Sequence, residues 1–292
     1  MQKIIPFLWF DSQAEEAANF YVSVFKNSEI GETFHYDKAS AEVSGQPEGS
    51  VLTVGFTLDG FELSTLNGGP MFKFSPAVSF FANYTDEKYL DTLWENLVEG
   101  GKILMEYTKY PFSEKYGWLE DKYGVSWQLS LADSKQKITP SLLFVGDQYG
   151  KATEAMNMYV ALFENSGTEI SVPYEKGEEK NGKEGAIKFA KFSLNGQDFI
   201  AMDSGMDHKF TFTEAISFLI NCETQEEIDK FWDAFADGGE IQQCGWVRDR
   251  YGVTWQVVPS KLDEMLSNPR VMQVMLQMKK LVIADLEAAT NK

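Results

Sequence analysis

Cysteine and histidine are scarce in this sequence. Its 292 residues include two cysteines, Cys222 and Cys244, and two histidines, His35 and His208. Two cysteines are too few for a disulfide framework, which is typical of a reducing cytoplasmic setting. The sequence contains no Ser-His-Asp arrangement, phosphate-binding loop or GxGxxG fingerprint, so acyl transfer and nucleotide binding have no support.

Positive charge and long apolar runs are also lacking. Lysine and arginine number 26 against 44 acidic residues, which gives a net charge of -18. A surface of that sign repels nucleic acids and anionic membranes, so we expect neither as a partner. The apolar run Ile4–Phe10 is too short for a signal peptide, and no stretch reaches transmembrane length. With 43% hydrophobic residues, we expect a globular cytoplasmic protein.

One stretch of the sequence occurs twice. Residues 117–128 (GWLEDKYGVSWQ) return as residues 245–256, and 8 of the 12 positions are identical. Self-similarity at a long period indicates duplicated structural units. Each copy predicts a β-hairpin in which Asp accepts backbone hydrogen bonds at the turn and Gly takes a positive φ. Alternation in the second strand then places Gln128 and Gln256 on the face opposite the tryptophans that precede them.

The rest of the chain predicts four βαβββ units. The first opens with a strand at Ile4–Phe10 and a helix that begins with a capping box at Ser12–Glu15, and it contains a polar loop at 37–50. A second unit follows, and both units recur from Ile138.

These units define two modules, residues 1–131 and 138–260, and a helical tail at 261–292. The tail has a broad, methionine-rich apolar face. We expect this face to cover an exposed side of a module or to contact a partner in a homodimer.

The paired βαβββ units with a late D-x-Y-G-V-x-W hairpin resemble the vicinal-oxygen-chelate superfamily of glyoxalase I, extradiol dioxygenases and bleomycin-resistance proteins. The stretch Glu106–Gln128, with Tyr110-Pro111-Phe112 and Lys115-Tyr116-Gly117, is similar to its PhnB-like branch, also labelled as a 3-demethylubiquinone-9 3-methyltransferase domain. The resemblance covers residues 1–260. It implies an α+β fold of tandem glyoxalase-like modules whose mixed sheets are cupped around cavities and are followed by C-terminal helices. Such a fold hosts many reactions and does not define one.

Metal-dependent members of this superfamily hold their ion with His, Gln or Glu at four strand positions. The resemblance places these positions within each half, at Pro6, Thr65, Ala77 and Gln128 and at Pro140, Ala201, Ala215 and Gln256. A shift in register would bring in Ser79, Ser217 or Asp203. Because a catalytic divalent ion needs about three N, O or S ligands from the protein, we expect no metal and no cofactor in either half.

The candidate ligand-binding residues are side chains expected on the cavity walls: Gln128, Gln256, Trp118, Trp246, Tyr110, Phe112 and Thr65. An amide on an apolar wall either orients a ligand or satisfies a cross-strand partner. The aromatic segment with Tyr110 and Phe112 is present in the first half only, as a lid or as a packing patch. Glu106 and Glu120 are weak candidates for a general base, if a cavity desolvates them.

Three functions are consistent with the sequence. The first is a metal-independent small-molecule-binding protein, favoured by the unsuitable metal positions and the aromatic walls. The second is a metal-free enzyme that works from the first module. The third is a structural or interaction protein with vestigial pockets. Whether the chain is an enzyme is left open at this point, as is the identity of its ligand.

Overall fold

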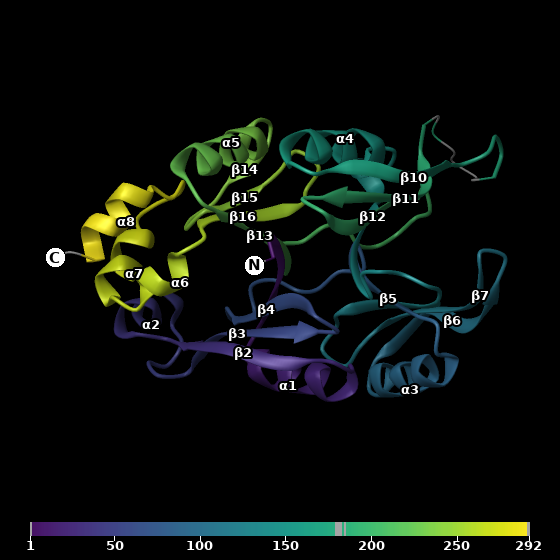
Figure 1. Cartoon of the computed structure of the whole chain (residues 1–292), viewed down its shortest axis with the longest axis horizontal. Helices are drawn as coiled ribbons and strands as arrows, with labels where there is room; N and C mark the ends of the chain where they lie inside the picture. The colour runs from purple at the N-terminus through teal and green to yellow at the C-terminus, as the bar shows by residue number, and fades with distance from the viewer. Residues whose placement is uncertain (1, 179–182, 184, 291–292) are drawn as a thin grey trace.

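The computed structural model describes residues 2–178, 183 and 185–290, and its elements follow four βαβββ units (Figure 1). The first unit contains β1 (Ile4–Phe10), α1 (Ala14–Val24), β2 (Glu29–His35), α2 (Lys38–Ser44), β3 (Val51–Leu58) and β4 (Phe61–Asn67). The second contains β5 (Val78–Tyr84), α3 (Glu87–Val98), β6 (Lys102–Tyr110), β7 (Ser113–Glu120) and β8 (Ser126–Leu131).

The second half repeats this order and ends in the helical tail. The third unit contains β9 (Ile138–Phe144), the 3-10 helix η1 (Gly146–Gln148), α4 (Ala152–Leu162), β10 (Gly167–Pro173), β11 (Ile187–Leu194) and β12 (Gln197–Asp203). The fourth contains β13 (Ile216–Cys222), α5 (Gln225–Ala236), β14 (Glu240–Ile241), β15 (Trp246–Arg248) and β16 (Thr254–Pro259). The tail contains α6 (Leu262–Leu266), α7 (Pro269–Met275) and α8 (Ile283–Thr290).

The strands form two eight-stranded mixed sheets, each of which joins one unit from each half of the chain. Sheet A has the order β14-β15-β16-β13-β1-β4-β3-β2, and sheet B has the order β10-β11-β12-β9-β5-β8-β7-β6. The two halves meet through antiparallel pairs, β1 with β13 and β5 with β9. The predicted α+β fold is confirmed. The sheets do not coincide with the two sequence halves, because the first strand of each unit pairs with the first strand of a unit from the other half.

Helices cover the outer face of each sheet. Figure 1 shows α4 and α5 on one side of the molecule and α1 and α3 on the opposite side, with the strands between them. Tyr21 of α1 stacks on Phe56 of β3, and Trp127 of β8 contacts Phe80 of β5, all within one continuous apolar core. Because successive strand residues point to opposite faces, the neighbours of these strand residues face the inner side of a sheet.

The repeated hairpin is held by the aspartate of its turn. Asp121 Oδ1 accepts the N–H groups of Tyr123 and Val125 at 2.9 and 3.0 Å, and the turn glycine has a φ of 90°. Asp121 Oδ2 accepts the Tyr21 hydroxyl at 2.7 Å and the Trp127 indole N–H at 2.9 Å. Since Tyr21 lies in the first unit and Asp121 in the second, this contact ties a unit of sheet A to a unit of sheet B. The second copy makes the same set of contacts.

Two local predictions are wrong. Helix α1 begins at Ala14, whose N–H donates to Asn67 Oδ1 at 2.8 Å, so a side chain from β4 replaces the predicted capping box. The predicted loop at 37–50 contains α2, capped by the Asp37 side chain and ended by Gly45 at a φ of 74°. In the described part of the chain, no helix is both long and apolar enough to cross a membrane.

Candidate functional site

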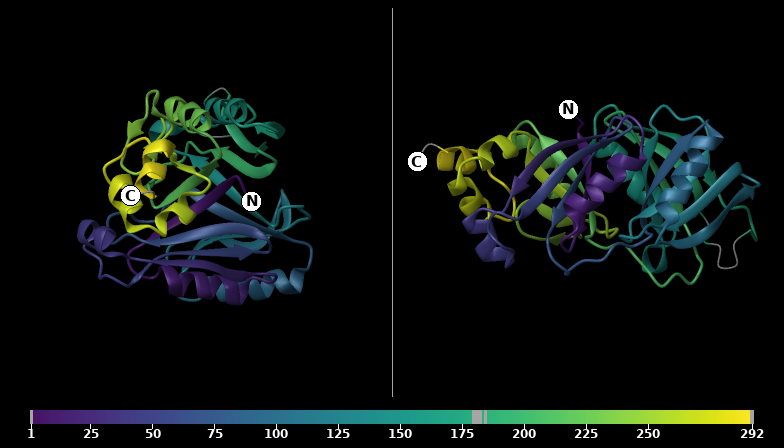
Figure 2. Two further views of the ribbon diagram at one scale, coloured as in Figure 1. Left: turned by 60° about the vertical axis from the view of Figure 1, so that its left-hand side comes forward. Right: turned by 90° about the horizontal axis from the view of Figure 1, so that it is seen from below.

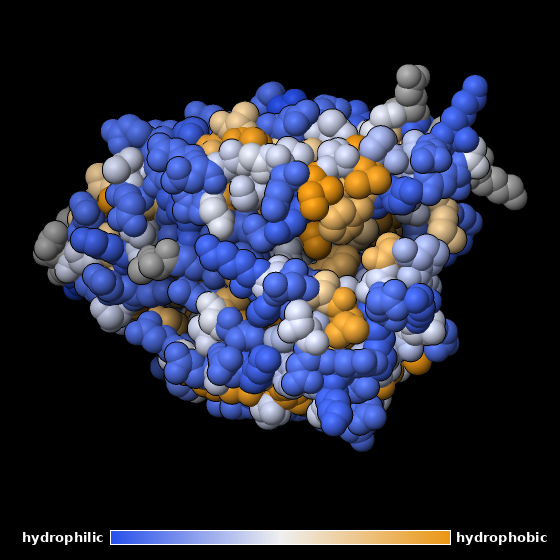
Figure 3. Space-filling view, turned by 45° about the vertical axis from the view of Figure 1, so that its right-hand side comes forward, coloured by the Kyte–Doolittle hydropathy of each residue, from blue (hydrophilic) through white to orange (hydrophobic). Residues whose placement is uncertain are grey.

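The inner face of sheet B is an apolar hollow. Phe81 of β5, Tyr116 of β7 and Ile200 of β12 form a buried cluster there. Other apolar side chains from β6, β7, β11 and β12 pack against it: Met105, Tyr110, Trp118, Phe189 and Met202. Figure 3 shows a hollow on this side of the molecule, with apolar surface gathered in and around it. A concave apolar surface with a few polar groups is the usual form of a small-molecule site.

A row of polar side chains crosses the base of this hollow over four neighbouring strands. The Gln128 amide, which is 2% exposed, donates to Ser79 Oγ at 2.7 Å and accepts a hydrogen bond from the Tyr116 hydroxyl. Burial raises the pKa of Tyr116 well above its usual value, so this hydroxyl stays protonated and donates. Ser141 is the strand partner of Ser79, and its buried hydroxyl has no hydrogen-bond partner among the described residues. The row therefore has unused hydrogen-bonding capacity at Ser141.

The β6–β7 hairpin adds an aromatic rim to the hollow. Tyr110 stacks on Phe112 with ring centroids 5.4 Å apart, and Phe112 contacts Tyr116 at 5.1 Å. Phe112 is 67% exposed at the hairpin tip. Trp118 is the strand partner of Gln128 on β8, and its indole N–H donates to Ser126 Oγ at 2.7 Å. The corresponding strands β14 and β15 have only two and three residues, so this rim belongs to sheet B alone.

The inner face of sheet A carries related residues, and the tail packs against one part of it. Gln256 donates to Ser217 Oγ at 2.9 Å, and Trp246 contacts Trp9 with ring centroids 5.9 Å apart. Val258 and Leu219 of this face pack with apolar side chains from α6, α7 and α8. The left view of Figure 2 shows the tail helices between the two arms of sheet A. Of the two sequence alternatives for the tail, the structure shows packing against the chain's own sheet.

The predicted metal-ligand positions need two corrections. Each inner face combines both halves of the sequence, so Thr65 lies in sheet A whereas Gln128 lies in sheet B. The register on the first and fourth strands of the units is also off by one residue. Thr65 is fully buried and pairs with Val54 on the helix-covered face. Pro6, Pro140 and Ala201 are buried on the helix-covered faces as well. Ala77 and Ala215 come just before β5 and β13. The inner positions are Ser79, Gln128, Ser141 and Ile200 in sheet B, and Phe7, Ser64, Ser217 and Gln256 in sheet A.

These inner positions do not fit a divalent metal ion. Each sheet offers one neutral amide, hydroxyl groups and one apolar side chain, whereas such an ion takes about three imidazole, thiolate or carboxylate ligands. Within residues 2–178, 183 and 185–290, no three His, Cys, Asp or Glu side chains gather closely enough to hold a metal. Asp203 is turned to the helix-covered side, where it accepts the N–H groups of Gly150 and Ile187 at 2.8 Å each.

The two candidate bases lie away from a desolvated cavity. Glu106 is exposed on β6. Glu120 is the strand partner of Lys102, with which it forms an ion pair at 3.5 Å. Neither carboxylate contacts the Ser141-to-Tyr116 row in the described structure, so the geometry assigns them no part in the sheet B site.

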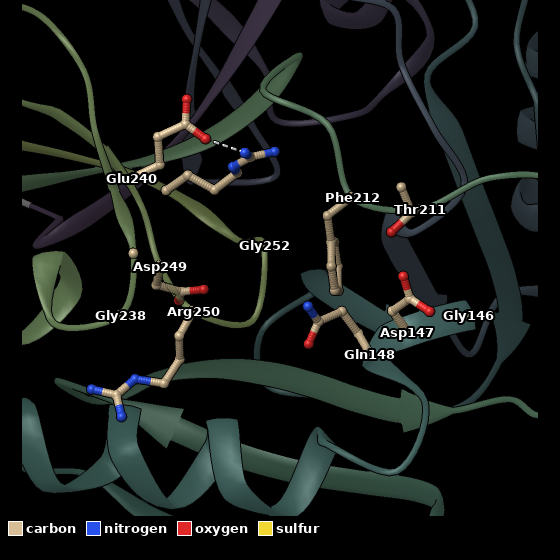
Figure 4. Close-up of a pocket in the computed structure, with 12 residues that line it drawn as sticks. Gly146, Asp147, Gln148, Thr211, Phe212, Gly238, Glu240, Asp249, Arg250 and Gly252 are labelled. Atoms are coloured by element: carbon tan, nitrogen blue, oxygen red, sulfur yellow. Dashed lines mark hydrogen bonds and ion pairs between the residues drawn. The ribbon is translucent and has the colours of Figure 1, made fainter.

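Two other cavities, of about 610 and 510 Å³, are lined mainly by turns and connecting segments. The larger one is lined by η1, by the segment that contains Phe212, and by the turn around Asp249 (Figure 4). Its arginines are engaged: Arg248 pairs with Glu240, and Arg250 pairs with Asp237. The smaller one is formed by two connecting segments, including Lys73 and Lys209. Neither cavity is lined by Gln128, by Gln256 or by the aromatic rim of sheet B.

Sequence reasoning missed several residues of the sheet B face, namely Phe81, Ser141, Phe189, Ile200 and Met202. Alternation along β5 was a usable signal for Phe81, which is two residues from Ser79. The others come from the third unit. Their placement beside Gln128 follows from the pairing of β5 with β9, which has no local signal in the sequence.

Comparison with known proteins identifies the family. A family model described as 3-demethylubiquinone-9 3-methyltransferase matches residues 2–130 and again residues 136–258. No curated protein matches the chain.

Several solved structures are similar to parts of the chain or to its fold. The chain is 45% identical to a PhnB protein from Bacillus cereus, over 45% of this chain and 100% of that one, with a TM-score of 0.41. It is 32% identical to a protein from Staphylococcus aureus, over 46% of this chain and 98% of that one, with a TM-score of 0.19. Glyoxalase I from Zea mays is 10% identical over 95% of this chain and 97% of its own, with a TM-score of 0.59, a likeness of fold. The chain therefore belongs to the family described as 3-demethylubiquinone-9 3-methyltransferase, whose model it matches twice in tandem.

Proposed function

We propose that this protein binds a flat, neutral, largely apolar small molecule on the inner face of sheet B without a metal ion. The observation that carries the proposal is the apolar hollow with the hydrogen-bonded row of Gln128, Ser79 and Tyr116 at its base. Aromatic side chains favour a flat ligand because stacked and edge-on ring contacts add to the gain from apolar burial. The net charge of -18 disfavours an anion.

The polar row supports a ligand that offers an acceptor oxygen. Ser79 Oγ accepts from the Gln128 amide, so its own hydrogen is available to donate. The Ser141 hydroxyl stands opposite on β9 and is unpaired. Both hydroxyls are buried, at 0 and 1% exposure of their residues, so a ligand reaches them only when the apolar side chains above them move aside. A carbonyl or ether oxygen would then accept from these donors, and an apolar group in that place would leave them unsatisfied.

Binding is favoured over catalysis because the row contains only neutral groups. Gln128, Ser79 and Ser141 do not transfer protons near neutral pH, and the carboxylates of Glu106 and Glu120 lie elsewhere. We place this activity in the cytoplasm, on the support of the cysteine content.

Calorimetric titration with two naphthalenes tests this proposal. We expect saturable binding of 2-acetylnaphthalene and weaker binding of 2-ethylnaphthalene, which has a similar shape but no acceptor oxygen. Gln128→Leu should weaken binding of the ketone more than binding of the hydrocarbon. The matched control Gln256→Leu, on sheet A, should change the affinity for neither compound. Dialysis against a chelator should leave the affinity unchanged.

Three results would contradict the proposal. One is the absence of saturable binding of either compound. Another is equal loss of affinity in Gln128→Leu and Gln256→Leu. The third is a loss of binding in chelator that a divalent ion restores, which would return the site to metal-dependent chemistry. Native mass spectrometry of the purified protein reads any bound metal or organic adduct directly, together with the predicted homodimer.

A further inference from the structure

The cavity of about 510 Å³ lies where two connecting segments, residues 68–77 and 204–215, meet, and we call it the connector cavity. The first segment joins β4 to β5 and the second joins β12 to β13, so each carries the chain from one sheet to the other. Ser75 Oγ donates to the carbonyl of Thr211 at 2.6 Å, and Thr213 Oγ1 donates to the carbonyl of Lys73 at 2.8 Å. These reciprocal hydrogen bonds hold the two walls of the cavity together.

Two aromatic rings supply the apolar part of the connector cavity. Phe74 and Phe210, one from each segment, line the cavity, are partly buried and pack against the main core. Phe74 also contacts Phe10 of β1 with ring centroids 5.0 Å apart. Fixed walls with partly exposed rings suit the apolar body of a small ligand, and the volume is within the usual range for such sites.

The charged groups that line this cavity are basic, against the balance of the whole chain. The sequence has 44 acidic residues and 26 lysines and arginines. The connector cavity nevertheless has Lys73, Lys209 and His208 in its lining and, among the described residues, no carboxylate. An anion therefore meets local positive charge here, although the protein as a whole repels it.

Both lysines are available to a ligand. Lys73 is exposed and has no ion-pair partner within the described part of the chain. Lys209 pairs with Asp207 at 2.6 Å, but the two side chains are 82% and 83% exposed. Ion pairs in water contribute little, so the Lys209 ammonium can turn to a bound anion at small cost. The His208 ring is placed by Ser204, whose Oγ lies 2.9 Å from Nε2.

We propose that the connector cavity binds a small organic anion, a carboxylate on an aromatic or similar apolar body. Lys73 and Lys209 bind the carboxylate through charge-assisted hydrogen bonds, and Phe74 and Phe210 contact the body. The site takes a charged ligand where sheet B takes a neutral one, and the two sites share no residue. Either proposal therefore fails without the other.

Fluorine NMR titration of the full chain with 4-fluorobenzoate and 4-fluorobenzamide tests this site. The probes have nearly the same shape, and only the first is an anion. We expect saturable binding of the benzoate and weaker binding of the amide. Lys73→Gln should weaken binding of the benzoate by about two- to fivefold, the range for one exposed charge pair, and adding Lys209→Gln should weaken it further. The matched control Lys88→Gln, which removes an exposed lysine on α3, should leave the affinity unchanged.

Three results would overturn the proposal: no saturable binding of the benzoate, equal affinity for the two probes, or equal loss of affinity in Lys73→Gln and Lys88→Gln. Loss of folding does not confuse the test, because the Lys73 side chain is exposed and only its carbonyl holds the second segment. If Gln128→Leu removes benzoate binding and Lys73→Gln does not, the probe occupies sheet B, which refutes the connector site and leaves the function proposed for sheet B standing.

Discussion

Replacing Asp121 by asparagine tests the network that holds the late hairpin, and with it the Gln128 strand, against α1. Asp121 is 3% exposed, and its Oδ2 accepts the Tyr21 hydroxyl and the Trp127 indole N–H. The Nδ2 of an asparagine carries hydrogens and cannot accept from the indole. A buried donor left without an acceptor costs about 1–3 kcal/mol. Asp121→Asn should therefore lower the free energy of unfolding by that amount while the wild-type carboxyl is protonated.

The comparison changes with pH because burial raises the pKa of Asp121 to about 6. Hydrogen bonds from Tyr21, Trp127 and the turn amides offset only part of that effect. The unfolded chain has the ordinary aspartate pKa, about 3.9. The folded state binds the proton more tightly, so its stabilisation is complete below the unfolded pKa and is lost as pH rises through the folded one. A shift of two units corresponds to about 3 kcal/mol.

Urea denaturation of the wild type and Asp121→Asn between about pH 4 and pH 7 measures this difference. We expect the wild type to be more stable near pH 4 and to lose about 2 kcal/mol relative to the variant by pH 7, since the unfolded carboxyl is already about half ionised at pH 4. Pairwise comparison at each pH removes the titration of the other carboxylates. Asp249→Asn should show the same direction, since burial also raises the pKa of Asp249. A wild-type advantage that grows with pH would refute the reasoning, because the four donors would then outweigh burial.

Three further predictions concern single contacts. Asn67→Ala should lower the unfolding free energy by about 1 kcal/mol in thermal denaturation, because the first amide of α1 loses its cap. Gly101→Ala should cost about 1–3 kcal/mol, since its Cβ would lie 2.2 Å from a β7 carbonyl oxygen, whereas Gly167→Ala, with open space around it, should be nearly neutral. Burial raises the pKa of Cys222 to about 12, so iodoacetamide should alkylate it only after unfolding; rapid alkylation of the folded protein would contradict its burial.

The local parts of this fold could be predicted because their signals lie within a few residues. The repeated Asp-x-Tyr-Gly turn gave the hairpins, and its aspartate accepts the expected backbone amides. The period of two along β8 correctly placed Gln128 opposite Trp127. The aromatic segment of the first half and the helical tail were also visible as differences between two copies of one pattern.

Longer-range contacts were not predictable in the same way. Asn67 caps a helix 53 residues earlier in the chain, so the local Ser12–Glu15 pattern was misleading. Thr65 was expected on a cavity wall, but its strand turns Ser64 inward instead. A register error of one residue exchanges the two faces of a strand, and composition does not reveal it where both faces are largely apolar.

Sequence alone determined the four units, their hairpins and the chemical character of the inner strands. The tertiary structure decided which units share a sheet, that Ser141 of the third unit pairs with Ser79 of the second, and that the tail packs on sheet A. The physical reason is that strand pairing uses the same backbone groups for every partner. Four similar units could therefore pair in more than one way, and only the packing of the whole chain selects among them.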